Sequence, residues 1–264
     1  MSHSNSSPWS DDRQAAVSLT FDDGSASHLD IAMPILEEYN LLGTFYINPR
    51  GDDWEQRYLP WRNAALAGHE IGNHTIQHIC TRNFGWNTDK CLENVSLEYI
   101  EADVLEAERR LNTLIPEQQI RTFCYPCYQS YVGEGINRQS YVPMIAKHFP
   151  AARGLGEAAN HPLLTDLHYL TSSVVAGWMS GSDLRSLVDS GTDGGRWLIL
   201  TLHGLQTEPK REGTFTPLFH GEALPADSFR ELCKHLAERG TEIWTAPVVT
   251  VAQKIIEWRE RITG

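Results

Sequence analysis

Two adjacent carboxylates, Asp22 and Asp23, and two histidines four residues apart, His74 and His78, are the residues of this sequence best suited to chemistry. Neighbouring carboxylates raise each other's pKa unless a counter-charge lies nearby, and a metal ion is the simplest counter-charge. One carboxylate and two neutral imidazoles form a ligand set that leaves open positions for water. We therefore predict a metal site formed by Asp23, His74 and His78. Asp22 is then free to act as the base of a metal-dependent hydrolase.

The predicted ligand set calls for one divalent cation. Carboxylate and imidazole ligands together accept zinc, cobalt, nickel, manganese or ferrous iron, so the ligands alone do not select among these metals. We expect zinc, with cobalt, nickel or manganese as alternatives. A further histidine, His203, ends the apolar segment of residues 197–202 and is placed to protonate a leaving group.

Strand-like and helix-like segments alternate along the chain and must position these residues. Short apolar runs predict strands over residues 15–21, 43–47, 69–73, 120–125, 169–175, 197–202 and 242–245. Amphipathic patterns predict helices over residues 30–39, 59–67, 90–114, 139–149, 181–190, 226–239 and 248–262. Repeated strand–helix units imply a parallel sheet, either closed into a barrel or doubly wound. Because barrels carry their chemistry at the carboxyl ends of the strands, the positions of Asp22, His74 and His203 support their assignment.

Length, composition and charge limit the partners and the domain organisation. The 264 residues carry 22 basic and 34 acidic side chains, a net charge of −12, which argues against nucleic acid and anionic membranes as partners. No segment reaches the roughly 20 apolar residues that cross a bilayer, and the N-terminal residues do not resemble a signal peptide. We therefore expect a cytoplasmic protein, although a secreted chain without its signal would look the same. We predict a disordered tail over residues 1–12 and one catalytic domain over residues 13–264. The sequence does not predict the oligomeric state.

The five cysteines predict no disulfide framework. Their number is odd and their spacing follows no scaffold pattern, which favours reduced thiols. Cys124 and Cys127 form a C-x-x-C pair, but no second pair accompanies it and no helix start follows it. We therefore expect packing and backbone geometry from these two residues, in preference to zinc binding or redox chemistry.

Three motifs make the chain similar to the polysaccharide deacetylase family, also called the NodB-homology or carbohydrate esterase family 4 group. They are Thr20–Gly24 (TFDDG), His74–His78 (HTIQH) and Leu200–His203 (LTLH), and the resemblance covers roughly residues 13–255. It implies a distorted (β/α)7 barrel with a single domain. It also implies that Asp22 is the general base, that Asp23 and the two histidines of the second motif bind the metal, and that His203 is the general acid.

The third family motif is altered in this sequence. The pattern R-x-F-R-P-P-Y-G aligns with residues 121–128, so Cys124 stands where the family has the arginine that supports the catalytic aspartate. Many relatives vary at this position, which makes Cys124 a variant and not a loss of function. The resemblance further implies that the backbone N–H of Cys127 stabilises the oxyanion, a role that does not depend on the side chain.

The sequence does not identify the residue that orients Asp22 or His203, because the fourth family motif has no match. Arg121 and Arg153 are candidates, although structural salt bridges are favoured for both. The residues predicted to contact the substrate lie in or beside the motifs, or in a long connection: Tyr125, Pro126, Tyr128, Trp178 and Leu202.

We predict that the protein removes N-linked or O-linked acetyl groups from a carbohydrate, using metal-activated water, an aspartate base and a histidine acid. The alternative is a metal-dependent C–N hydrolase of a small cyclic amide or ureide, which the expected cytoplasmic location, the reduced thiols and the altered motifs leave open. A third class is a non-catalytic sugar-binding protein with a structural metal. Asp22 and His203 argue against this class, since a binding protein needs neither.

Overall fold

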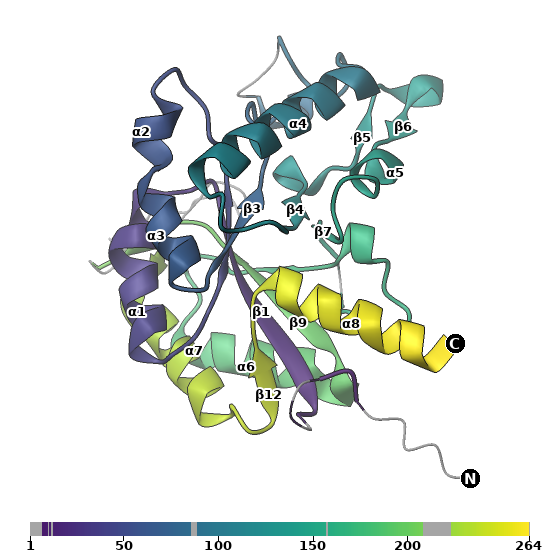
Figure 1. Cartoon of the computed structure of the whole chain (residues 1–264). Coiled ribbons are helices and arrows are strands. Elements are labelled where there is room, and N and C mark those ends of the chain that lie inside the picture. The colour runs from purple at the N-terminus through teal and green to yellow at the C-terminus, as the bar shows by residue number, and fades with distance from the viewer. Residues whose placement is uncertain are drawn as a thin grey trace.

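The computed structural model describes residues 7–9, 11, 13–85, 89–156, 158–207 and 223–263. In this part of the chain one sheet of eight parallel strands curls into a distorted half-barrel (Figure 1). The strand order is β7-β4-β3-β2-β1-β9-β8, and β12 pairs with β1. The strands are β1 Ala15–Asp22, β2 Thr44–Ile47, β3 Glu70–Asn73, β4 Phe123–Cys124, β7 Ala152–Arg153, β8 Ser173–Val174, β9 Trp197–Leu202 and β12 Ile243–Thr245. This architecture confirms the predicted distorted (β/α) barrel with a single domain.

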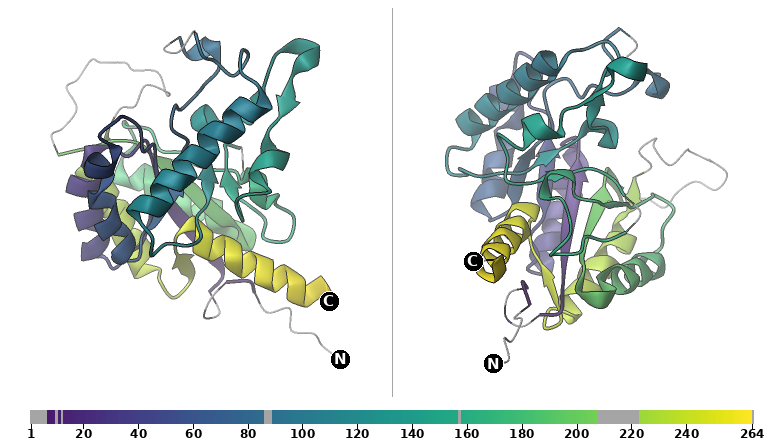
Figure 2. Two further views of the ribbon diagram at one scale, coloured as in Figure 1. Left: turned by 45° about the horizontal axis from the view of Figure 1, so that its top comes forward. Right: turned by 90° about the vertical axis from the view of Figure 1, so that its right-hand side faces the viewer.

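Helices surround the sheet, as the two further views in Figure 2 show. They are the π-helix η2 His28–Ala32 and the α-helices α1 Met33–Glu38, α2 Trp54–Tyr58, α3 Pro60–Leu66, α4 Leu97–Leu114, α5 Val142–Ile145, α6 Gly181–Thr192, α7 Ala226–Glu238 and α8 Val248–Thr263. Two short strand pairs lie outside the main sheet: β5 Tyr131–Val132 with β6 Gln139–Ser140, and β10 Leu205–Gln206 with β11 Leu224–Pro225. None of the described helices combines the length and the apolarity that crossing a membrane requires.

Strand β1 is the centre of the sheet. All eight of its residues are buried, as expected for a parallel strand that is covered on both faces. Its first half pairs with β12 and its second half with β2, while β9 runs along its other edge over residues 16–21. The carboxyl end of β1 is therefore held by neighbours on both sides, and the aspartate pair follows at that end.

The apolar core is divided by the sheet. The largest cluster joins β1, β2 and β9 to α1, α3, α6 and α7, and a second cluster lies under α8. Trp9 packs into the second cluster and is 4% exposed. Most of the tail predicted over residues 1–12 lies outside the described residues.

Some element boundaries differ from the prediction for local reasons. The predicted helix over 90–114 begins at Leu97, because the Ser96 hydroxyl accepts a hydrogen bond from the N–H of Tyr99 and caps the helix there. The strand predicted over 120–125 is reduced to two residues, and the equally short β7 was not predicted. A two-residue strand has no periodic pattern by which the sequence could reveal it.

Candidate active site

The aspartate pair divides into one buried and one accessible carboxylate at the end of β1. Asp22 is the last residue of the strand and is 3% exposed. Asp23 follows with a φ of 75°, and Gly24 continues the turn with a φ of 62°. This left-handed turn leads the chain out of the sheet and leaves the Asp23 side chain 45% exposed. The two carboxylates therefore lie in different surroundings, which suits two different roles.

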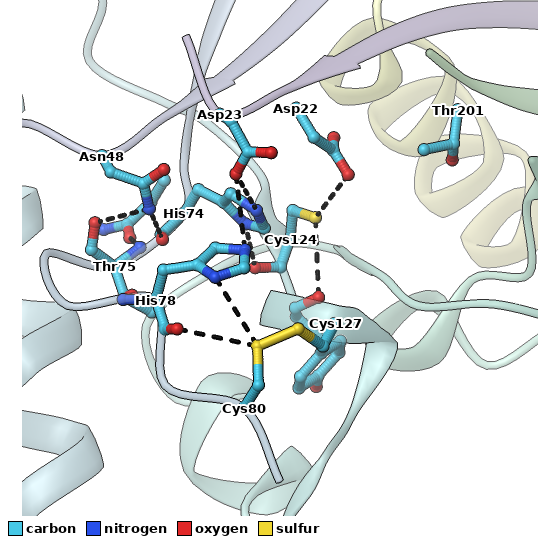
Figure 3. Close-up of polar contacts among 12 residues, drawn as sticks. Asp22, Asp23, Asn48, His74, Thr75, His78, Cys80, Cys124, Cys127 and Thr201 are labelled. Atoms are coloured by element: carbon cyan, nitrogen blue, oxygen red, sulfur yellow. Dashed lines mark hydrogen bonds and ion pairs between the residues drawn. A yellow bond between two sulfur atoms is a disulfide. The ribbon is translucent and has the colours of Figure 1, made fainter. Parts of the chain in front are cut away.

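The three predicted metal ligands converge, as Figure 3 shows. The Oδ1 atom of Asp23 lies 3.6 Å from Nε2 of His74 and 3.4 Å from Nε2 of His78. All three ligand atoms lie within 4.8 Å of one another. The two histidines come together because Thr75 and His78 adopt left-handed backbone conformations, which fold the segment after β3 into a tight loop.

The hydrogen bonds of the loop fit these residues for metal ligation. The Nδ1 atom of His74 lies 2.9 Å from the carbonyl oxygen of Cys124. Because a carbonyl only accepts, Nδ1 carries the proton and Nε2 keeps its lone pair for a metal. The side-chain amide of Asn48 donates to the carbonyl oxygens of His74 and Thr75 and fixes the loop from the neighbouring strand.

His78 is uncharged at neutral pH and can ligate. Burial, followed by the charge of His74, lowers the pKa of His78 to about 4. A neutral imidazole is the form that a metal requires. The chemistry and the spacing of Asp23, His74 and His78 therefore fit one divalent cation.

Arg153 supplies the cation that faces Asp22. Its Nη2 atom lies 2.5 Å from both carboxylate oxygens, and the arginine side chain is fully buried. Burial would raise the pKa of Asp22, but the charges of Arg153, His74 and His203 and the hydrogen bond from Arg153 outweigh it and lower that pKa to about 2. Asp22 is therefore ionised and held in one orientation across the neutral pH range.

Strand register explains how Arg153 reaches this position. Arg153 pairs directly with Cys124 in the parallel contact between β7 and β4. Arg153 on the adjacent strand therefore supplies the guanidinium that the family motif has at the position of Cys124. The Nη1 atom of Arg153 donates hydrogen bonds to the hydroxyls of Thr201 at 2.6 Å and Ser172 at 3.2 Å. Arg153, one of the two arginines named as candidate partners of Asp22, therefore forms the expected core salt bridge, and its partner is Asp22 itself. Arg121 has such a bridge, to Glu108 at 2.5 Å.

His203 lies beside the aspartate pair. Leu202, which precedes His203, pairs directly with Phe21, which precedes Asp22, in the contact between β9 and β1. The backbone of His203 is held by His28, whose Nε2 atom lies 2.6 Å from the His203 carbonyl oxygen. Burial lowers the pKa of His28 to about 4, so this residue is a neutral donor. The sequence analysis did not select His28, because only the tertiary contact distinguishes it from an ordinary helical histidine.

Cys127, whose backbone N–H was predicted to stabilise the oxyanion, is not a free thiol. Cys127 and Tyr128 are both left-handed, with φ of 50° and 62°, directly after Pro126. Cys127 forms a disulfide with Cys80, two residues beyond His78 (Figure 3). The prediction of reduced thiols was therefore wrong for these two cysteines, since partners 47 residues apart are joined only by the folding of two loops. Among the described cysteines the remaining three are free and buried: Cys91, Cys124 and Cys233.

The predicted substrate contacts differ in their exposure. Tyr125 is fully buried and its hydroxyl donates to the carbonyl of His168 at 2.7 Å, so its side chain supports the loop and is not available to a substrate. Pro126 and Leu202 are also buried. Tyr128 is partly buried, with its ring centroid 5.7 Å from the guanidinium carbon of Arg153. Trp178 is 63% exposed.

Comparison with known proteins shows similarity in sequence and in fold. The polysaccharide deacetylase family model matches residues 10–135. A Mycobacterium smegmatis protein assigned to the polysaccharide deacetylases has a similar structure, with a TM-score of 0.60 and 16% identity, over 94% of this chain and 92% of that one. The peptidoglycan deacetylase PdaC of Bacillus subtilis is also similar, with a TM-score of 0.53 and 16% identity over 95% of each chain.

Two further relatives limit what the likeness implies. A CE4 family pseudoenzyme from Bacillus anthracis has the same fold, with a TM-score of 0.55 and 14% identity, over 92% of this chain and 66% of that chain. A gellan lyase from Bacillus sp. is 28% identical over 147 residues, which are 55% of this chain but only 5% of the lyase. Fold alone therefore does not establish activity.

Fold and site together define the chain as a distorted (β/α) barrel protein with polar residues gathered at the carboxyl ends of its strands. The family match and the similar structures confirm the resemblance to the polysaccharide deacetylases that the three motifs predicted. The match of the polysaccharide deacetylase family model to residues 10–135 agrees with the prediction of a polysaccharide deacetylase-like hydrolase.

Proposed function

We propose that this protein removes N-linked or O-linked acetyl groups from a carbohydrate. The observation that carries the proposal is the pairing of a buried, ionised Asp22 with Arg153 beside the converging side chains of Asp23, His74 and His78. A protein that only binds sugar needs no buried carboxylate with a dedicated counter-charge. This argument comes from the site, because one of the similar structures is a pseudoenzyme.

Each residue has one task in the proposed reaction. Asp23, His74 and His78 would hold a divalent cation, zinc by our expectation, which when bound supplies Lewis acidity and lowers the pKa of water. Asp22 accepts the proton of the attacking water, and Arg153 keeps its carboxylate ionised and oriented.

The remaining tasks concern the acyl oxygen and the leaving group. The backbone N–H of Cys127 donates to the acyl oxygen as negative charge develops there. His203 delivers a proton to the departing amine or alcohol, so the acetyl group leaves as acetate.

The substrate class is tested by acetate release. Three kinds of acetylated carbohydrate are tested: peptidoglycan fragments, for which the similar deacetylase PdaC is named, and also chitooligosaccharides and acetylated xylan. We expect acetate from one of them with protein loaded with zinc, cobalt or nickel, and none after chelation or in Asp22→Asn. The matched control is Asp30→Asn, which removes an exposed carboxylate on η2. Stoichiometric metal binding without acetate from any of the three would end this proposal in favour of the cyclic amide or ureide hydrolase.

The disulfide also bears on the cellular location. The cyclic amide or ureide alternative relied partly on reduced thiols, and the bond between Cys80 and Cys127 removes that argument. Disulfides persist mainly in oxidising compartments. We therefore propose that the protein works in such a compartment, which also favours an extracellular polymer over a cytoplasmic small molecule as its substrate.

A further inference from the structure

Backbone strain gathers in the two loops that the disulfide joins. The loop after β3 holds Thr75 and His78, with φ of 62° and 50°, and the loop after β4 holds Cys127 and Tyr128, with φ of 50° and 62°. Residues other than glycine rarely adopt this left-handed conformation, and they keep it only where the surroundings impose it. The Cys80–Cys127 disulfide ties these two loops to each other (Figure 3).

Each loop also carries a group with a proposed role. His78 is two residues before Cys80, and the N–H proposed to face the acyl oxygen belongs to Cys127 itself. One covalent bond therefore sets the distance between a proposed metal ligand and the proposed oxyanion donor.

The disulfide also touches the imidazole directly. While Nε2 of His78 faces Asp23, its Nδ1 atom lies 3.6 Å from Sγ of Cys80. A metal-ligating histidine donates its other ring N–H to an acceptor, and that partner fixes the tautomer. His74 has the carbonyl of Cys124 for this purpose, whereas His78 has a disulfide sulfur. Such a sulfur has no proton and can only accept, so it favours the tautomer with a free Nε2.

We propose that the Cys80–Cys127 disulfide is a redox-sensitive positioning element, which holds His78 in its ligating tautomer and Cys127 in its oxyanion-binding conformation. A dithiol reduces it in a balanced exchange: the S–S bond breaks, two thiols form here, and the reductant becomes a disulfide. The Cys80 thiol can then donate a hydrogen bond to an unprotonated Nδ1 of His78, which favours the tautomer with its proton on Nε2, and this tautomer cannot ligate through Nε2. Cys127 is partly exposed whereas Cys80 is buried, so we expect the dithiol to approach from the side of Cys127.

The test measures zinc affinity. Only the second readout, acetate release, rests on the proposed function. The full chain is compared in the oxidised form and after treatment with excess dithiol, with the reductant removed anaerobically so that it does not chelate metal. Zinc affinity is measured by competition with a chromophoric chelator, and near-UV circular dichroism reports whether each sample is folded. Cys80→Ser/Cys127→Ser is the non-reducible variant, and Cys233→Ala, which removes a buried free thiol elsewhere, is the matched control.

We expect the reduced protein and the double variant to bind zinc about 10- to 100-fold more weakly, the range for loss of a partner of a metal ligand. Reoxidation should restore affinity in the wild type and leave the double variant unchanged. Equal affinity in the folded reduced protein would overturn the proposal. So would tighter binding, because His78, Cys80 and Cys127 would then form a ligand set of their own. Global unfolding on reduction would identify the bond as a general stabiliser and overturn it as well.

This result is independent of the substrate. If no carbohydrate released acetate, the proposed function would fail while the zinc measurement kept its meaning. If acetate were released equally by oxidised and reduced protein of equal zinc affinity, the proposed function would stand and the redox proposal would fail.

Discussion

Replacing Arg153 with methionine removes the buried cation that faces Asp22 and keeps an unbranched side chain in its place. The pKa of Asp22 is about 2, against an ordinary 3.8, so its surroundings favour the ionised form by about 2 kcal/mol. Burial acts in the opposite direction, and without Arg153 it dominates. We therefore expect the pKa of Asp22 to rise above 3.8 in Arg153→Met. The fold should also lose about 3–5 kcal/mol, since an uncompensated buried charge remains.

The direction of the pH effect follows from linkage. The pKa of Asp22 is lowered in the folded protein, so its contribution to stability is complete above pH 3.8 and is lost as the pH falls through about 2. In Arg153→Met the pKa in the folded protein lies above 3.8, so the contribution of Asp22 changes sign and its ionised carboxylate destabilises the fold above that pKa. Proton acceptance by Asp22 should then limit catalysis at mildly acidic pH.

The assay is the pH profile of kcat/KM for acetate release, measured with the metal-loaded protein. We expect the acidic limb of Arg153→Met to move upward by about two pH units or more, and Arg153→Lys, which keeps a charge, to recover part of the shift. Arg121→Met is the control, because it removes an equally buried guanidinium that pairs with Glu108 and does not contact Asp22. An unchanged profile in folded Arg153→Met would refute the role assigned to this pair.

Three further predictions test the remaining parts of the site. Asp22→Asn should retain metal and lose about 10²- to 10⁴-fold in kcat, as removal of a general base does; full activity in this variant would exclude Asp22 as the base. His78→Ala should lower metal affinity in a chelator competition before any effect of substrate is considered, and unchanged affinity would remove His78 from the ligand set. Cys80→Ser/Cys127→Ser should lower the free energy of unfolding in urea by about 4 kcal/mol, the loop-closure value for a separation of 47 residues. A loss well below 1 kcal/mol would show that the two loops stay together without the bond.

The sequence identified most of the polar residues that meet at the site. The TFDDG turn and the HTIQH loop each contain their functional side chains within five residues, so local backbone geometry is enough to predict them. The alternation of apolar runs and amphipathic segments also predicted a parallel sheet, closed into a barrel or doubly wound, and the family resemblance favoured the barrel. Parallel strands place their carboxyl ends at one edge. Asp23, His74 and His78 could therefore be proposed as one ligand set before their distances were known.

Other features depended on contacts that no local pattern encodes. Arg153 supports Asp22 only because β7 pairs with β4 in a register that sets it beside Cys124. These strands are two residues long, and the packing of the whole barrel decides their register. The packing of the whole barrel also turns Tyr125 into the core, although its place in the third motif suggested a substrate contact.

The chemical groups of this protein and the turns that present them follow from consecutive residues, because short-range geometry and apolar periodicity are local properties of the chain. The tertiary structure decided which groups are partners: Arg153 with Asp22, His28 with the His203 carbonyl, and Cys80 with Cys127. Such pairs join residues far apart in the chain, and their distances follow from the combined packing of many elements. That packing also sets the burial that shifts the pKa of Asp22 and His78, and with it the chemistry the site can perform.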